Sequence, residues 1–191
     1  MIEPSAIRPV VLIGGLSRRF GRDKLREPLA SGGLLVDRPI AALRAVFGRR
    51  VVGVGPAHAE VIGRVDQVLP DAWEGAGPAG GLLTVLDAFD APVFLLSGDL
   101  PWITSASISA VVEAAAASPH ADAVLAASVG TDGHRQPEPC IGIYRPCLRS
   151  RLRARLDVGN RRLWDLPEHP EYVFLPAAEL AGANTPADLH G

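Results

Sequence analysis

The chain has 191 residues, of which 48% are hydrophobic and 21% charged, and its formal net charge is −2. That composition is typical of one globular domain, which we expect to span residues 1–191, and it gives no reason to expect nucleic-acid or membrane binding. No apolar segment approaches the roughly 20 residues of a membrane-spanning helix, and no secretory signal is visible. The two cysteines, Cys140 and Cys147, form neither a disulfide framework nor a metal-ligand pattern, so we expect a reduced, cytoplasmic enzyme.

The first predicted element is a buried parallel strand that ends in a glycine-rich loop. The apolar run from Ile7 to Ile13 breaks at Gly14 and Gly15, and the chain stays loop-like through Gly21. Adjacent glycines let backbone N–H groups approach a ligand without interference from a Cβ atom. A cluster of positive side chains follows: Arg18, Arg19, Arg22, Lys24 and Arg26. A glycine-rich turn after a strand, followed by cations, is typical of a polyphosphate site.

Lys24 is the only lysine among the 19 basic residues. Lysine is a compact point charge that fits between phosphate oxygens, whereas arginine is a broad planar fork. We interpret Lys24 as a phosphate ligand; the alternative is chance within an arginine-rich composition. The common phosphate-binding loop is excluded, because Asp23 stands where that loop has glycine and Leu25 where it has serine or threonine.

A helix and two short strands are predicted next. Residues 27–37 form an irregular excursion with a short hairpin, and Asp37 caps a helix that ends at Gly48. Strands are expected at residues 50–54 and 67–69, with a weak helix at residues 57–63 between them. Gly53 and Gly55 do not complete a dinucleotide fingerprint, because His58 stands where the third glycine belongs, and we expect His58 on the surface of the weak helix.

The second glycine-rich stretch runs from Pro70 to Gly81 and is predicted to be a loop. It opens an amphipathic helix whose apolar residues are Leu82, Leu83, Leu86 and Phe89. One interpretation is a loop that lies along a bound nucleotide, with Asp71 in contact with it. The alternative is a plain structural loop.

The most hydrophobic strand is predicted at residues 92–97, and Asp99 follows it directly. Open α/β sheets bind ligands at the carboxyl ends of their strands, so Asp99 is expected in that crevice. One carboxylate together with substrate phosphates suits Mg²⁺. The alternative role, a helix cap, is better met by Thr104 and Ser105, so we favour the metal.

The second half of the chain is predicted to alternate helices and strands. Helices are expected at residues 105–117 and 148–156, and strands at residues 122–128, 140–145 and 172–175. His134 and Arg135 lie in the predicted turn before the strand at residues 140–145. We expect them either to bind an acceptor phosphate or to be solvated. The four arginines at every second position of residues 149–155 fall on two helical faces, which predicts a mostly solvated helix.

These segments resemble the molybdenum cofactor guanylyltransferase family (MobA-type), a branch of the nucleotidyltransferases. The family's first signature, Leu-Ala-Gly-Gly-x-Ser-x-Arg-Met-Gly-x-Asp-Lys, is matched at Leu12, Gly14, Gly15, Ser17, Arg19, Gly21, Asp23 and Lys24. The chain departs from it at Ile13 and Phe20. The resemblance spans nearly the whole chain, with its segments in the right order.

Further signatures follow the same order. The second, an aspartate before Gly-Pro-Leu-Ala-Gly, is matched loosely by Asp71 and residues 77–81, and Cys-Asp-x-Pro is matched at Asp99 with Gly98 in place of cysteine. The last, Asn-x-Asn-Thr-Pro-Glu-Asp-Leu, is matched at residues 184–189 with departures. The letters Thr185 and Pro186 are equally explained as a helix N-cap followed by proline.

The resemblance implies a single-domain three-layer α/β sandwich with a mostly parallel sheet, the Rossmann-like nucleotidyltransferase fold. It implies Mg²⁺-dependent transfer of GMP from GTP to a molybdopterin-type cofactor, with release of pyrophosphate. It implies Arg19, Lys24 and Asp99 as catalytic residues, with Asp99 on the metal. The nucleotide is then bound by Leu12, Ile13, Gly14, Gly15, Ser17, Lys24, Asp71, Gly77 and Asp99, and the acceptor by Arg135, Gln136, Arg161 and Asn184.

Lys24 and Asp99 are thus expected to face one triphosphate from the same side of the molecule. The resemblance also implies contact with molybdoenzymes or other cofactor-biosynthesis proteins. Two alternatives stay open at this point. One is a related transferase that uses CTP with a molybdopterin acceptor, or a sugar phosphate or phospholactate as acceptor. The other is an accessory protein that binds nucleotide or cofactor without turnover, which the departures at Ile13, Phe20 and Gly98 permit.

Overall fold

The computed structural model describes residues 2–14, 23–30, 32–48, 50–130, 133–183 and 186–189, with side chains omitted at residues 186 and 187. Its centre is a seven-stranded sheet in the order β3-β2-β1-β4-β6-β5-β7. Within these residues, no helix has the length and apolar character needed to cross a membrane.

The strands and helices follow the predicted order closely. The strands are β1 (Arg8–Leu12), β2 (Val52–Val54), β3 (Gln67–Leu69), β4 (Val93–Ser97), β5 (Ala123–Val129), β6 (Arg135–Tyr144) and β7 (Pro170–Phe174). The α-helices are α1 (Asp37–Phe47), α2 (Ala59–Ile62), α3 (Pro78–Ala88), α4 (Ser105–Ala117), α5 (Arg149–Asp157) and α6 (Ala177–Leu180). Short 3-10 helices are η1 (Pro4–Ala6), η2 (Lys24–Arg26), η3 (Pro146–Leu148) and η4 (Pro186–Leu189).

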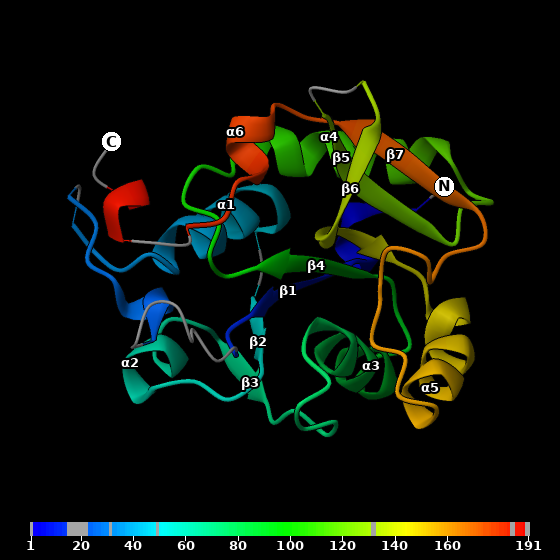
Figure 1. Ribbon diagram of the computed structural model, residues 1–191, viewed down its shortest axis with the longest axis horizontal. Helices are drawn as coiled ribbons and strands as arrows, with labels where there is room; N and C mark the ends of the chain where they lie inside the picture. Colours follow the sequence, from blue (N-terminus) through cyan, green and yellow to red (C-terminus); the bar gives the residue numbers. More distant parts are fainter. Residues whose placement is uncertain are drawn as a thin grey trace.

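The sheet is mostly parallel, and helices cover both of its faces. Only β6 runs antiparallel to its neighbours β4 and β5, while β7 returns parallel to β5. Helices α1 and α4 lie on one face, and α3 and α5 on the other (Figure 1). Side chains alternate along each strand, so Phe94 joins the core under α1 and α4 while Leu95 joins the core under α3 and α5. The predicted three-layer α/β fold is confirmed.

The start of α3 differs from the prediction, which placed residues 78–81 in a loop. The helix already begins at Pro78, so Gly80 and Gly81 lie in its first turns. A Cβ at Gly80 would come within 2.8 Å of the Trp73 carbonyl oxygen, and one at Gly81 within 2.9 Å of the Leu12 side chain. These glycines therefore allow the helix to pack closely against its preceding loop and against β1, which outweighs their poor helix propensity.

Strand β6 is longer than predicted and forms a projecting arm with β5. Its residues 141–144 pair with β4, but residues 135–138 pair only with Ala126–Val129 of β5, beyond a register shift in the β5 strand. The arm therefore has an open edge, which tolerates Pro137 and Pro139, since proline lacks the N–H that an inner strand needs. Arg135, which the prediction placed in a turn before a strand at residues 140–145, is thus the first residue of β6, because pairing with β5 lengthens the strand.

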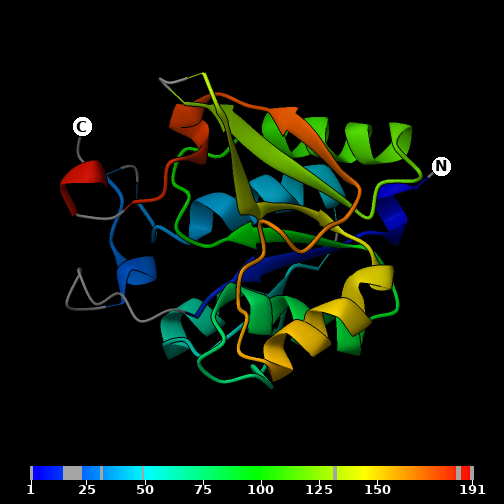
Figure 2. The same cartoon turned by 45° about the vertical axis from the view of Figure 1, so that its right-hand side comes forward.

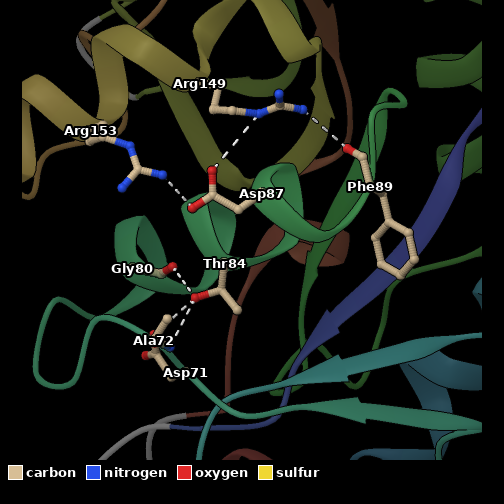
Figure 3. A network of polar contacts seen from close by, with 8 residues as sticks. All are labelled: Asp71, Ala72, Gly80, Thr84, Asp87, Phe89, Arg149 and Arg153. Atoms are coloured by element: carbon tan, nitrogen blue, oxygen red, sulfur yellow. Dashed lines mark hydrogen bonds and ion pairs between the residues drawn. The ribbon is translucent and has the colours of Figure 1, made fainter.

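Helix α5 is less solvated than predicted, because its four arginines all form ion pairs. Arg149 and Arg153, four residues apart, face Asp87 of α3, with which Arg153 pairs at 2.7 Å and Arg149 at 3.9 Å (Figure 3). Arg149 also pairs at 3.1 Å with Asp90, just after the end of α3. Arg151 and Arg155 face the following loop and pair with Glu168 and Asp165. The arginines therefore lie on two faces of the helix, as their spacing predicts. One face attaches α5 to α3, and the other attaches it to the loop that follows.

Substituting Gly142 tests the tight packing of the inner strands. A Cβ at this position, between β4 and β5, would lie 2.5 Å from the Val124 carbonyl oxygen and 2.7 Å from the Leu125 side chain. We expect Gly142→Ala to lower the free energy of unfolding by about 1–3 kcal/mol, because the strands must shift to relieve the overlap. Urea denaturation measures the change.

The matched control is Gly63→Ala at the end of α2. Gly63 has a φ of −65°, and the new Cβ would lie 3.5 Å from the Ala59 carbonyl oxygen, an ordinary contact. We expect this control to change the unfolding free energy by less than about 0.5 kcal/mol. Equal effects of the two substitutions would contradict the predicted overlap at Gly142.

Candidate functional site

The candidate site lies at the carboxyl ends of β1 and β4. These strand ends, the helical turn η2 and the segment that follows α6 all lie on the left of the molecule in Figure 2, together with the tip of the β5–β6 arm. This is the edge at which open α/β sheets bind their ligands. Segments far apart in the sequence therefore share one crevice.

An ion pair between Lys24 and Asp99 forms the centre of this site. The Nζ atom of Lys24 contacts Oδ2 of Asp99, and the two side chains are only 22% and 19% exposed. Ser97 donates a hydrogen bond of 2.5 Å to the other carboxylate oxygen, and Lys24 also donates to the carbonyl oxygen of Ala183 at 3.4 Å. The structure thus brings together the two side chains that the sequence analysis expected to face one ligand.

Local sequence explains how Lys24 and Asp99 reach one another. The side chain of Asp23 accepts a hydrogen bond from the Leu25 amide at 3.1 Å and starts η2, which holds Lys24 in a short helical turn. Leu25 is buried against Gly98, whose added Cβ would lie 3.3 Å from the leucine methyl groups and 2.6 Å from the Leu12 carbonyl oxygen. Glycine at position 98, where the resembled family has cysteine, therefore suits the close approach of β1, β4 and η2.

The glycine that ends β1 also allows close backbone packing. A Cβ on Gly14 would meet Pro56 at 2.7 Å and the Gly55 backbone at 3.0 Å, and Gly55 itself has a φ of +109°. Ile13 is buried and donates its amide to the Val54 carbonyl oxygen, while the Leu12 carbonyl oxygen accepts from Gly98. These three residues line the strand end, and their nucleotide contacts stay predictions. Gly15, Ser17, Arg19 and Phe20 lie outside the described residues.

The predicted nucleotide loop, residues 71–77, is attached to α3. One carboxylate oxygen of Asp71 accepts from the Trp73 amide at 2.9 Å and lies 3.3 Å from the Thr84 hydroxyl (Figure 3). Gly77 precedes α3 with a φ of 64°, a left-handed conformation that glycine adopts without strain. Asp71 and Gly77 therefore lie at the two ends of one constrained loop, as a binding loop requires.

The predicted acceptor residues lie in two places. Arg161 donates to the Gly75 carbonyl oxygen at 2.6 Å, so it braces the nucleotide loop from a shallow pocket formed by residues 158–162. Arg135 and Gln136 are exposed on the β5–β6 arm, where the Arg135 guanidinium stacks 4.0 Å from the centre of the Tyr172 ring. Asn184 lies outside the described residues, although the neighbouring Ala183 amide donates to the Asp99 carbonyl oxygen.

Charges near Asp99 act on the arm as well. Burial raises the pKa of the Cys140 thiol to about 12, and the negative charges of Asp99 and Glu138 add to the shift. Burial alone raises the pKa of Glu138 above its ordinary value. Cys140, on the neighbouring antiparallel strand, therefore lies within the electrostatic influence of both Asp99 and Glu138.

The oxygen donors at Asp99 fit Mg²⁺. Within the described part of the chain, no three histidine, cysteine or acidic side chains gather closely enough to hold a metal by themselves. Mg²⁺ is commonly held by one or two carboxylates with substrate phosphates and water completing its shell, and the partly buried carboxylate of Asp99 meets that need. A soft or borderline metal such as Zn²⁺ would require more protein ligands.

Several groups of the site were not predicted from the sequence. Ser97 stands two residues before Asp99, and the two-residue period of a strand was a signal that both share one face. Thr84 interrupts an apolar helix, which marks a buried hydroxyl with a partner. The Ala183 carbonyl and the Tyr172 ring carry no comparable local signal, because only the tertiary fold brings them to Lys24 and Arg135.

Comparison with known proteins agrees with this geometry. Residues 9–172 match the family described as the MobA-like NTP transferase domain. The chain belongs to this family. It is therefore a nucleotidyltransferase domain.

Individual relatives extend the comparison. A probable molybdenum cofactor guanylyltransferase of Chloroflexus aggregans is 31% identical over 94% of this chain and 90% of its own length. The structure of molybdopterin-guanine dinucleotide biosynthesis protein A from Archaeoglobus fulgidus has a TM-score of 0.75 at 20% identity, covering 96% of this chain and 95% of that one. A 2-C-methyl-D-erythritol 4-phosphate cytidylyltransferase of Francisella tularensis has a TM-score of 0.74 at 12% identity, with 97% of each chain covered. The two structures show the shared fold.

The two cysteines provide a test of the electrostatics around Asp99. At pH 8 a thiol with a pKa near 12 is ionised in only about one molecule in ten thousand, and the thiolate is the reactive form. We expect iodoacetamide to label the exposed Cys147 in the native protein and to spare Cys140 until the chain is unfolded. Peptide mass spectrometry measures both sites, Cys147→Ser is the control, and rapid native labelling of Cys140 would contradict the described environment.

Proposed function

We propose that this protein transfers GMP from GTP to a molybdopterin-type cofactor and releases pyrophosphate. The observation that carries the proposal is the contact of Lys24 with Asp99 in the strand-end crevice. An isolated cation or carboxylate would suit many functions, whereas an ammonium group beside a carboxylate supports the proposal of one phosphate ligand next to one metal ligand. The naming of full-length relatives as guanylyltransferases supports the base and the acceptor.

The reaction needs positioning and charge neutralisation more than covalent chemistry. The acceptor's terminal phosphate is already ionised near neutral pH, so the attack on the α-phosphorus of GTP requires no general base. The bond from the α-phosphorus to the bridging oxygen breaks, and pyrophosphate leaves with that electron pair. Lys24 binds the β- and γ-phosphate oxygens in this scheme and neutralises the charge that develops on the leaving group, assisted by Arg19.

Asp99 would hold Mg²⁺, with Ser97 keeping the carboxylate in position through its hydrogen bond. When bound, Mg²⁺ acts as a Lewis acid on phosphate oxygens. Before nucleotide arrives, the Lys24 ammonium neutralises the carboxylate, so Asp99 does not remain an unpaired negative charge in a partly buried site. Asp71 and the backbone at Leu12, Ile13, Gly14, Gly15, Ser17 and Gly77 complete the proposed nucleotide site.

The acceptor is proposed to approach from the β5–β6 arm. Arg135 and Gln136 lie on the part of β6 that extends past the end of β4, and stacking on Tyr172 holds the Arg135 guanidinium. Arg161 and Asn184 are the further acceptor candidates. We also propose a reducing cytoplasmic setting, which the two free thiols support, and contact with molybdoenzymes or other cofactor-biosynthesis proteins, for which the chain's family is the support.

A second candidate is a transferase for another nucleotide, and one observation favours it. The cytidylyltransferase of Francisella tularensis has the same fold, so the fold by itself is compatible with more than one base. Pyrophosphate release measured with GTP, CTP, ATP and UTP, with and without molybdopterin, separates the candidates. The proposal requires pyrophosphate release that depends on both GTP and molybdopterin. Pyrophosphate release with CTP and with none of the other three nucleotides would favour the second candidate.

Removing the Lys24 ammonium tests its phosphate role. We expect Lys24→Ala to lower turnover by about 100-fold or more, the scale seen when one preorganised donor is lost. The control is Arg26→Ala in the same helical turn, because Arg26 pairs instead with Glu60 of α2 at 2.6 Å on the surface. Steady-state pyrophosphate release measures both variants, and an unchanged rate for Lys24→Ala would refute the assigned role.

Removing the Asp99 carboxylate tests the metal role. Asp99→Ala is expected to abolish Mg²⁺-dependent pyrophosphate release while the far-ultraviolet circular dichroism stays that of the parent. Ser97→Ala serves as the control, because it removes a hydrogen bond and keeps the carboxylate, so its Mg²⁺ titration should still saturate. An Asp99→Ala protein that responds to added Mg²⁺ like the parent would show that the metal is held elsewhere.

A further inference from the structure

Thr84 is a buried hydroxyl in the middle of an otherwise apolar helix. It is 8% exposed, and the residues around it in α3 are the leucines and valine that form the core under this face of the sheet. A buried hydroxyl in such surroundings is costly unless it is hydrogen-bonded. Its partners therefore explain why the position is threonine and not the similarly shaped valine.

The Thr84 hydroxyl meets three groups from two segments. It accepts a hydrogen bond from the Ala72 amide at 3.1 Å, and it lies 2.9 Å from the Gly80 carbonyl oxygen and 3.3 Å from Oδ1 of Asp71 (Figure 3). A hydroxyl has one hydrogen, so it donates to only one of the two oxygens at a time. The shorter distance favours the Gly80 carbonyl, while Asp71 also accepts from Trp73.

These contacts fix the first residues of the nucleotide loop to the helix. The Ala72 amide is tied directly to Thr84, and the Asp71 carboxylate lies between the Thr84 hydroxyl and the Trp73 amide. At the far side of the same loop, Arg161 donates to the Gly75 carbonyl oxygen. The loop is thus held at two points before any ligand binds, which lowers the ordering cost of binding.

We propose that Thr84 is a positioning residue that presets Asp71 and the residue 71–77 loop for the nucleotide. The inference rests on the proposed function, since it takes Asp71 to be a nucleotide contact. Thr84 itself does not touch the substrate in this proposal. It holds the Ala72 amide and thereby fixes the adjacent Asp71, so its effect on nucleotide binding must disappear when the Asp71 carboxylate is removed.

The positioning claim is tested first without nucleotide. Thr84→Val keeps the branched shape and removes the hydroxyl, whereas Thr84→Ser keeps the hydroxyl. We expect amide hydrogen exchange at Ala72, followed by NMR, to become at least about fivefold faster in Thr84→Val, which corresponds to loss of one ordinary hydrogen bond, and to stay near the parent rate in Thr84→Ser. Unchanged exchange at Ala72 in Thr84→Val would overturn the inference.

The ligand claim is tested by kinetics with the nucleotide that the parent enzyme uses. Thr84→Val should raise the KM for that nucleotide by about fivefold or more, with a smaller change in kcat, and Thr84→Ser should restore it. In an Asp71→Ala background, adding Thr84→Val should change the KM by less than twofold, because the residue through which it acts is gone. Full additivity of the two substitutions would overturn the inference, as would faster Ala72 exchange with an unchanged KM.

A matched hydroxyl deletion separates positioning from general loss of stability. Tyr144 is fully buried in the same core, and its hydroxyl donates at 2.6 Å to the carbonyl oxygen of Pro139, a residue of β6 and not of the residue 71–77 loop. Tyr144→Phe should therefore lower the melting temperature without accelerating exchange at Ala72 or raising the nucleotide KM, and equal effects of Tyr144→Phe and Thr84→Val would overturn the inference. Failure of the proposed function appears separately, as a parent protein that uses none of the four nucleotides.

Discussion

The ion pair between Lys24 and Asp99 is the interaction on which the arrangement of the site depends. Taking one charge out of water is costly, and a partly buried carboxylate without a partner would favour the entry of water or the loss of its charge. Each member of the pair therefore lowers the free-energy cost of partly burying the other charge. The ion pairs of α5 differ in their place, because they hold a helix against its neighbouring segments. The Lys24–Asp99 pair instead lies at the proposed nucleotide site, and in that proposal each member exchanges its partner for part of the ligand.

Close packing of three strand ends makes this contact possible. Gly14, Gly55 and Gly98 each stand where an added Cβ would come within 3.0 Å of a neighbouring residue's backbone. The ends of β1, β2 and β4 therefore approach more closely than side chains would allow, and η2 can fold over β4 with Leu25 as its buried anchor. Gly14, which suggests ligand binding in the sequence, thus also has a packing role in the structure, and Gly55 and Gly98 share that role.

The sequence predicts this fold well because the strong patterns are local. Short apolar runs bounded by glycine gave every parallel strand near the site, and the Thr104 cap and the Gly48 end of α1 were visible as single residues. Lys24 and Asp99 were also visible, one by its uniqueness and one by its place after the central strand. Errors arose where a distant contact decides the outcome. The first turn of α3 is stabilised by packing on β1, the arm of β6 by pairing with β5, and the arginines of α5 by acids from other elements.

Helix α3 connects these nonlocal features into one support for the site. Thr84 and Asp87 lie three residues apart, so they share a face of the helix, and each binds a different segment. Thr84 holds the beginning of the residue 71–77 loop, while Asp87 holds α5, after which the chain brings Arg161 back to Gly75 in that loop. Both attachments of the loop therefore lead to one buried helix that also packs on β1. A loop supported in this way can contain Gly75 and Gly77 and still keep one conformation, because the constraint comes from the helix and from Arg161 and not from the loop's own side chains.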